Sequence, residues 1–141
     1  MARGCQSEYN PRMHPDVIGR FLVTAFFAIV FLQSALDKLL DRQGNLEYFS
    51  DHFKNSPVAS LVPLLFRVLT VIELSAGGLC TLGVLVGSFR SKGMSLAACG
   101  VALSGVALLS LLLGQRLAKD YAGAAVVAAY FAVALVGLGL F

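Results

Sequence analysis

The stretch IELSAGGLCTLGVLVG, residues 72–87, decides the fold, because it is apolar except for Glu73 and a few small polar residues. It belongs to a longer run from Lys54 to Arg90 in which Arg67 and Glu73 are the two charged residues between the ends. A helix needs about 20 predominantly apolar residues to cross the hydrocarbon core of a bilayer. We therefore predict a transmembrane helix here, with Arg67 near an interface.

Three further runs of the same kind lie on either side. They extend between Arg20 and Asp37, between Lys92 and Arg116, and from Tyr121 to the last residue. The first run is short, but flanking basic side chains extend it by reaching towards the headgroups. A cleaved signal peptide is the alternative for that run. About 20 mostly polar residues precede it, however, and LQSALDK offers no small-x-small cleavage site.

The composition agrees with a membrane protein. The chain is 57% hydrophobic and 13% charged, whereas soluble domains have roughly 25% charged residues. The apolar runs do not alternate, and lipid admits only helices or closed barrels. We predict an all-α integral membrane bundle of four transmembrane helices, forming one domain over residues 1–141 with a polar N-terminal tail at 1–16. The expected partners are the lipid bilayer and other membrane proteins or a second copy, and not nucleic acid.

The first loop carries a pattern of its own. Leu46, Phe49 and Phe53 fall on one side of a turn of helix, which predicts a short amphipathic helix at the membrane interface. Such a helix is either a lid over a pocket between the spans or a connector whose aromatic side lies in the headgroups; interfacial aromatics are common, which favours the connector. His52 lies alone here, and a lone histidine is typically an ordinary polar residue.

Small residues predict where the helices approach each other, because lipid provides little hydrophobic drive for packing. In the second span, Glu73, Gly77 and Cys80 share one face. The later spans offer pairs of small residues spaced four apart, namely Gly100 with Ser104, Ala98 with Ala102, Ala125 with Ala129, and Ala128 with Ala132. These patterns indicate a tightly packed bundle.

Glu73 is the main candidate for chemistry, because an ionisable residue within the membrane is a functional-site candidate by default. It either carries a proton or is paired with a cation, and the candidate catalytic residues are therefore Glu73, Lys38 and Arg67. Lys38 ends the first span beside the start of the second, so we expect it nearer in depth to Arg67 than to Glu73. A structural role is the alternative, with Glu73 bonded to Gln33, Ser34, Ser104 or Tyr130.

A second candidate site lies in the last loop, GQRLAKDYAG. Arg116, Lys119 and Tyr121, together with Gln33, are candidate cofactor-binding residues for an anionic or quinone headgroup. The alternative is interfacial anchoring, with Asp120 capping the fourth helix. Since the cysteines and histidines are not clustered, we expect no metal site and no haem-binding histidine pair.

Orientation follows weakly from charge. Five basic residues lie on each side, namely Arg3, Arg12, Arg20, Arg90 and Lys92 against Lys38, Arg42, Lys54, Arg116 and Lys119. Three of the first group precede or open the first span, which usually dominates orientation. We therefore expect both termini in the cytoplasm.

Several segments together resemble the DoxX family of bacterial membrane proteins. They are Arg20, FLVTAFFAIVFLQSALDKLLD (21–41), NSP (55–57), IELSAGGLCTLGVLVG (72–87) and GQRLAKDYAGAA (114–125). Ala35 stands where the family often has glycine, which bears on how closely the first two helices meet. The resemblance implies a four-helix bundle in the bacterial inner membrane. It also implies an association with quinol oxidation, thiosulfate oxidation or thiol redox balance.

Three functions are open on these grounds. The leading one is a non-catalytic accessory subunit or partner of a membrane redox complex. The first alternative is a small quinone-linked oxidoreductase that uses Glu73 with Lys38 or Arg67, with quinone as its cofactor. The second alternative is a carrier of protons or small solutes.

Overall fold

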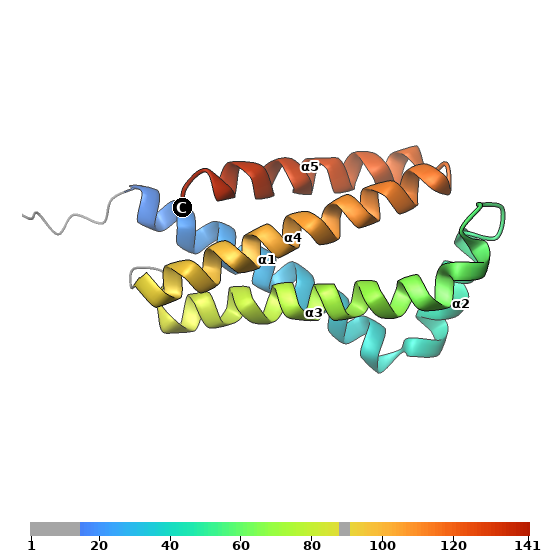
Figure 1. Cartoon of the computed structure of the whole chain (residues 1–141), viewed down its shortest axis with the longest axis horizontal. Coiled ribbons are helices and arrows are strands. Elements are labelled where there is room, and N and C mark those ends of the chain that lie inside the picture. Colours follow the sequence, from blue (N-terminus) through green and yellow to red (C-terminus); the bar gives the residue numbers. More distant parts are fainter. Residues whose placement is uncertain (1–14, 88–90) are drawn as a thin grey trace, which may run out of the picture.

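The computed structural model describes residues 15–87 and 91–141, which form helices joined by short connections (Figure 1). The elements are α1 (Pro15–Leu40), α2 (Arg42–His52), a 3₁₀ turn η1 (Ala59–Leu61), α3 (Val62–Val86), α4 (Ser91–Leu117) and α5 (Tyr121–Leu138). No strand occurs within these two ranges. Residues 1–14 of the predicted polar tail, with Cys5, lie outside the described residues.

Four of the helices are long and apolar enough to cross a membrane. They are α1, α3 together with η1, α4 and α5. Their outward-facing side chains are large and apolar, as at Leu85 and Val136, which are 75% and 71% exposed. Such surfaces on long apolar helices are typical of contact with lipid. The prediction of an all-α, multi-pass membrane bundle is therefore confirmed.

The helices pack around α3 and α4. In Figure 1, α3 lies beside both α1 and α4, and α5 covers the other side of α4 while also touching α1. The centre is filled by Phe27 and Phe31 of α1, Cys80 of α3, and Val101 and Leu108 of α4, all at most 2% exposed. This part of the bundle is closely packed.

Small residues set the closest approaches between helices, as predicted at Gly77 and Gly100; Gly83 was not among the predicted positions. A Cβ at Gly77 would lie 2.8 Å from the backbone nitrogen of Leu32, and one at Gly100 would lie 2.6 Å from Cys80 Sγ. A Cβ at Gly83 would meet the backbone of Ala97 at 2.8 Å. The helices can therefore reach these distances only because these positions lack a side chain.

The prediction for the fourth span was wrong. Ala125, Ala128, Ala129 and Ala132 all point away from the bundle and are exposed. The packed positions of α5 are instead Ala124, Ala134 and Gly137. An alanine-rich helix offers a small-residue pair on every face, so spacing alone does not select the face that packs. In α4, Ala102 is likewise exposed, whereas Ser104 is buried.

The contact between Gly77 and Leu32 also fixes the register of α1 against α3, which run antiparallel (Figure 1). Moving four residues along each helix from this contact brings Glu73 level with Leu36. Arg67 lies about 15 Å from Gly77 along α3 at 1.5 Å per residue, which is beyond the level of Leu40, the last residue of α1. The first turns of α3 therefore extend beyond the end of α1, and α2 lies alongside them.

Capping residues begin α2 and α5. The Asp41 carboxylate accepts a hydrogen bond from Gly44 N at 3.1 Å, and the Asp120 carboxylate accepts one from Gly123 N at 2.9 Å. Asp120 thus has the predicted capping role. Lys119, at φ 61°, makes the tight turn between α4 and α5.

Arg20, near the start of α1, joins three helices at the end of the bundle opposite α2. Its guanidinium donates to the carbonyl of Leu140 and contacts Met94 Sδ at 3.2 Å. It also lies over the ring of Phe141, 5.9 Å from the centroid. Arg20 therefore links α1 to α4 and to the end of α5.

Candidate functional site

Two of the three candidate catalytic residues meet inside the bundle. Lys38 Nζ lies 2.7 Å from Glu73 Oε2, and it also lies 2.7 Å from Ser34 Oγ. Ser34 Oγ in turn donates to Glu73 Oε2 at 3.3 Å. The ammonium, the carboxylate and the hydroxyl thus form a closed triangle between α1 and α3.

This triangle is almost completely sealed. The side chains of Lys38 and Glu73 are 8% and 1% exposed. Each charge is neutralised by the other, which is the arrangement that makes a buried ion tolerable. The expectation that Lys38 lies nearer in depth to Arg67 was wrong. That expectation assumed that α1 ends at the same depth in the membrane as α3 begins, whereas α3 begins well beyond the end of α1.

Arg67 takes no part in the triangle. Its side chain is exposed, and it lines a shallow groove with Lys38, Arg42 and Thr70. Among the described residues it has no carboxylate within salt-bridge distance. A pair between Arg67 and Glu73 is therefore not formed.

The other predicted partners of Glu73 do not bond to it. Ser104 Oγ donates to the carbonyl of Gly100 at 2.8 Å, and Tyr130 packs edge-on against Phe26 with the ring centroids 5.7 Å apart. Gln33 is exposed on the outer side of α1. Of the four partners considered, Ser34 alone makes the bond in the described structure.

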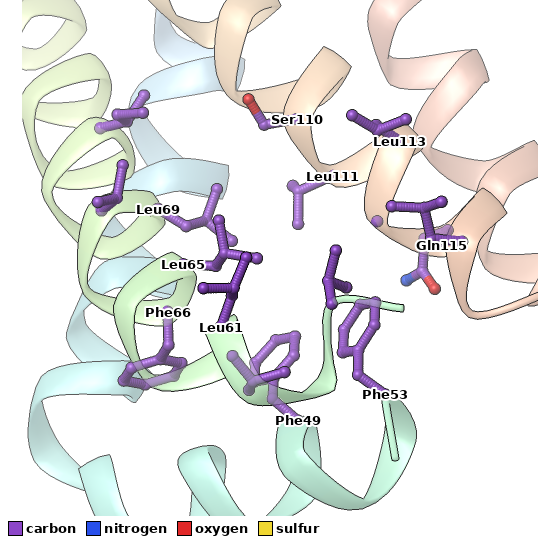
Figure 2. A pocket seen from close by; sticks show the side chains of 16 residues that line it. Phe49, Phe53, Leu61, Leu65, Phe66, Leu69, Ser110, Leu111, Leu113 and Gln115 are labelled. Carbon is purple, nitrogen blue, oxygen red and sulfur yellow. The ribbon is translucent and has the colours of Figure 1, made fainter. Parts of the chain in front are cut away.

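A cavity of about 330 Å³ lies between α3 and α4 (Figure 2). Leu65 and Leu69 of α3 face Leu111 of α4 across it, and Phe49 and Phe53 close one end. The described side chains that line it are apolar, apart from Ser110 and Gln115 of α4. The cavity is large enough for the body of a small apolar ligand.

The helix α2 forms the lid of this cavity. The ring of Phe49 lies 5.7 Å from that of Phe66 on α3, and 6.3 Å from that of Phe53. Phe53 also approaches Gly114 of α4, where a Cβ would lie 3.3 Å from the ring. Phe49 and Phe53 therefore face the bundle, as a lid over the cavity requires, whereas Tyr48 of α2 is 65% exposed.

A polar cluster that the sequence did not indicate holds the end of this lid. His52 Nε2 lies 3.1 Å from Gln115 Oε1 and 3.7 Å from Asp120 Oδ2. His52 was predicted to be alone, since its partners are more than 60 residues further along the chain. One signal in the sequence could have indicated this cluster. His52 follows Phe49 and Gln115 follows Leu111, so each polar residue ends a segment whose apolar residues line the cavity.

The three candidate residues of the last loop lie near this cluster in sequence but do not join it. Arg116 lies over the ring of Tyr121, 4.9 Å from its centroid. Tyr121 is 62% exposed, and Lys119 is also exposed. Their geometry is that of side chains at an interface. Gln33 lies on α1, which contributes no residue to the cavity wall.

Taken together, the site has two parts with different chemistry. The triangle of Lys38, Glu73 and Ser34 fixes α1 to α3, and its two charged side chains are almost fully buried. The cavity beneath α2 has space and apolar walls, with Gln115 near the phenylalanine end and Ser110 further along α4 (Figure 2). Within the described residues, no group of three histidine, cysteine, aspartate or glutamate side chains is placed to hold a metal ion.

Comparison of the chain with protein-family models, with curated proteins and with solved structures found no match.

Proposed function

We propose that this protein is a non-catalytic accessory subunit of a membrane redox complex, and that it binds an amphiphilic ligand of the quinone class beneath α2. The observation that carries the proposal is the cavity of about 330 Å³ between α3 and α4. Apolar walls with the Gln115 amide near one end suit a molecule with an apolar tail and a carbonyl-bearing head.

The position of the polar groups suggests how such a ligand lies. Gln115 lines the cavity, and its side-chain amide is held by His52. An amide nitrogen is a donor for a ring carbonyl. The head of the ligand would therefore lie near Gln115, with the tail between Leu69 and Leu111.

Binding without catalysis is supported by the separation of the cavity from the ionisable residues. The described residues that line the cavity include none of Glu73, Lys38 and Arg67. The Lys38–Glu73 pair is also closed on itself, which suits a structural role better than proton transfer to a ligand. The resemblance to the DoxX family is a separate support for a redox setting and for the bacterial inner membrane. The basic residues that precede or open the first span favour both termini in the cytoplasm.

The proposal is tested by purifying the protein from native membranes in mild detergent. Co-purifying proteins and extracted quinones are then identified by mass spectrometry. We expect respiratory subunits and a bound quinone in stoichiometric amounts. A chain that carries neither would contradict the proposal.

A matched pair of variants on α3 assigns any bound quinone to the cavity. Leu69→Trp places a large ring in the cavity, whereas Leu85→Trp places the same ring on the outside of the bundle, where Leu85 is 75% exposed. We expect the first variant to lose the quinone and the second to retain it. Equal retention in both variants would place the ligand elsewhere.

A further inference from the structure

A groove on the outside of the bundle joins the end of α1, the start of α2 and α3. It is lined by Lys38, Leu39, Arg42, Phe66, Arg67, Thr70 and Val71. Three of these residues are cationic, and the remainder are apolar except for Thr70. The groove is distinct from the cavity beneath α2 and shares only Phe66 with it.

The two arginines of this groove carry charge that the described protein does not neutralise. Lys38 is paired with Glu73, but Arg42 and Arg67 have no carboxylate within salt-bridge distance among the described residues. Asp41, the neighbour of Arg42 in sequence, is engaged as the cap of α2 and does not line the groove. Two unpaired positive charges that line one groove attract an anion to it.

Arg42 and Arg67 line the same groove. Arg67 lies beyond the level of Leu40, where α1 ends, and Arg42 begins α2 just after that end. The groove is therefore at the end of the first membrane-spanning segment, close to the headgroups. Guanidinium groups bind phosphate oxygens in pairs, and basic residues at the membrane surface attract anionic lipids. The apolar walls formed by Leu39, Phe66 and Val71 suit the upper part of an acyl chain.

We infer that the Arg42–Arg67 groove is a binding site for the phosphodiester headgroup of an anionic phospholipid. Arg42 and Arg67 bind the phosphate, and the apolar wall holds the adjoining acyl chain. Lys38 forms the floor and keeps its bond to Glu73. A bound lipid thereby bridges α1, α2 and α3 on the outside of the bundle.

Native mass spectrometry of the full chain in detergent provides the test. Phosphatidylglycerol is titrated against phosphatidylcholine with the same acyl chains, for the wild type, for Arg42→Gln/Arg67→Gln and for Lys54→Gln. Lys54 is the matched control, because its charge is already paired with Asp51 at 2.8 Å. The hydrogen bond from Lys54 and its charge hold the pKa of Asp51 below the ordinary value. Circular dichroism checks that all variants fold; Arg42 and Arg67 are both exposed.

We expect the wild type and Lys54→Gln to bind one phosphatidylglycerol in preference to phosphatidylcholine. The double variant should bind it at least tenfold more weakly, since each basic residue at a membrane surface contributes about fivefold. Equal binding by all three proteins would overturn the inference, as would equal binding of the two lipids. Displacement of phosphatidylglycerol by an equal concentration of inorganic phosphate would identify a site for free phosphate instead, and would also overturn it.

Discussion

Lys38 and Glu73 are 35 residues apart in sequence and 2.7 Å apart in the bundle, where their charges are sealed from solvent. The pair holds the last turn of α1 against the middle of α3. Its position follows from the register set at Gly77, and not from the positions of the helix ends. The ion pair and the glycine contact together determine how these two helices meet.

Breaking the ion pair should destabilise the bundle. Glu73→Gln or Lys38→Met alone leaves one buried charge without its partner, which costs about 3–5 kcal/mol. The double variant Lys38→Met/Glu73→Gln should recover at least half of that loss. Unfolding in denaturing detergent, followed by circular dichroism, measures the change. A Glu73→Gln protein as stable as the wild type would show that the pair does not hold the helices.

Gly77 and Gly78 are neighbours in α3 with opposite surroundings. A Cβ at Gly77 would lie 2.8 Å from Leu32 N, whereas one at Gly78 would meet nothing within 4 Å. Gly77→Ala should therefore destabilise the protein by about 1–3 kcal/mol through overpacking. Gly78→Ala should stabilise it by up to about 1 kcal/mol, because alanine favours the helix. Equal changes in stability for Gly77→Ala and Gly78→Ala in the unfolding assay would contradict the register of α1 against α3.

Asp120 should act on α5 through its cap. Asp120→Ala removes the acceptor for Gly123 N and should reduce stability by about 1 kcal/mol. Asp120→Asn keeps a capping oxygen and should retain most of that stability. Hydrogen exchange of the first turn of α5 reports the difference. If alanine and asparagine gave the same exchange rates, the cap would not be the cause.

The lid should loosen when its polar attachment is removed. Every residue of α2 keeps part of its surface exposed, so the helix depends on a few contacts at its ends and on its aromatic side. His52→Ala removes the contacts with Gln115 and Asp120 and should raise hydrogen exchange in α2 severalfold. Ser50→Ala, at an exposed position of the same helix, is the control. An unchanged exchange rate in His52→Ala would mean that Phe49 and Phe53 alone hold the lid.

Much of the fold was predictable because lipid imposes strong constraints on sequence. The four apolar runs required four helices, and the pattern of Leu46, Phe49 and Phe53 required the short one between them. The glycine faces of α3 and α4 were also predictable, since close packing in lipid depends on small residues. The alanine pairs of α5 were misleading, because that helix has small residues on all its faces.

The site was predictable only in part. Glu73 was identified because a charge within the membrane needs a partner, and Lys38 was among its candidates. Which cation pairs with Glu73 depends on helix register, which is set by the Gly77–Leu32 contact and is invisible in a single span. The cluster of His52, Gln115 and Asp120 depends on the approach of segments far apart in sequence. Neither local pattern nor composition contains that information.

The central claim is that the cavity beneath α2 binds a quinone-class ligand, and photolabelling tests it most directly. The wild-type protein in its native membranes is irradiated with an azido-quinone, and the labelled peptides are identified by mass spectrometry. We predict labelling that is concentrated at residues 65–72 and 110–117 and is abolished by Leu69→Trp. Labelling spread over the lipid-facing sides of the helices, including Leu85 and Val136, would contradict the claim.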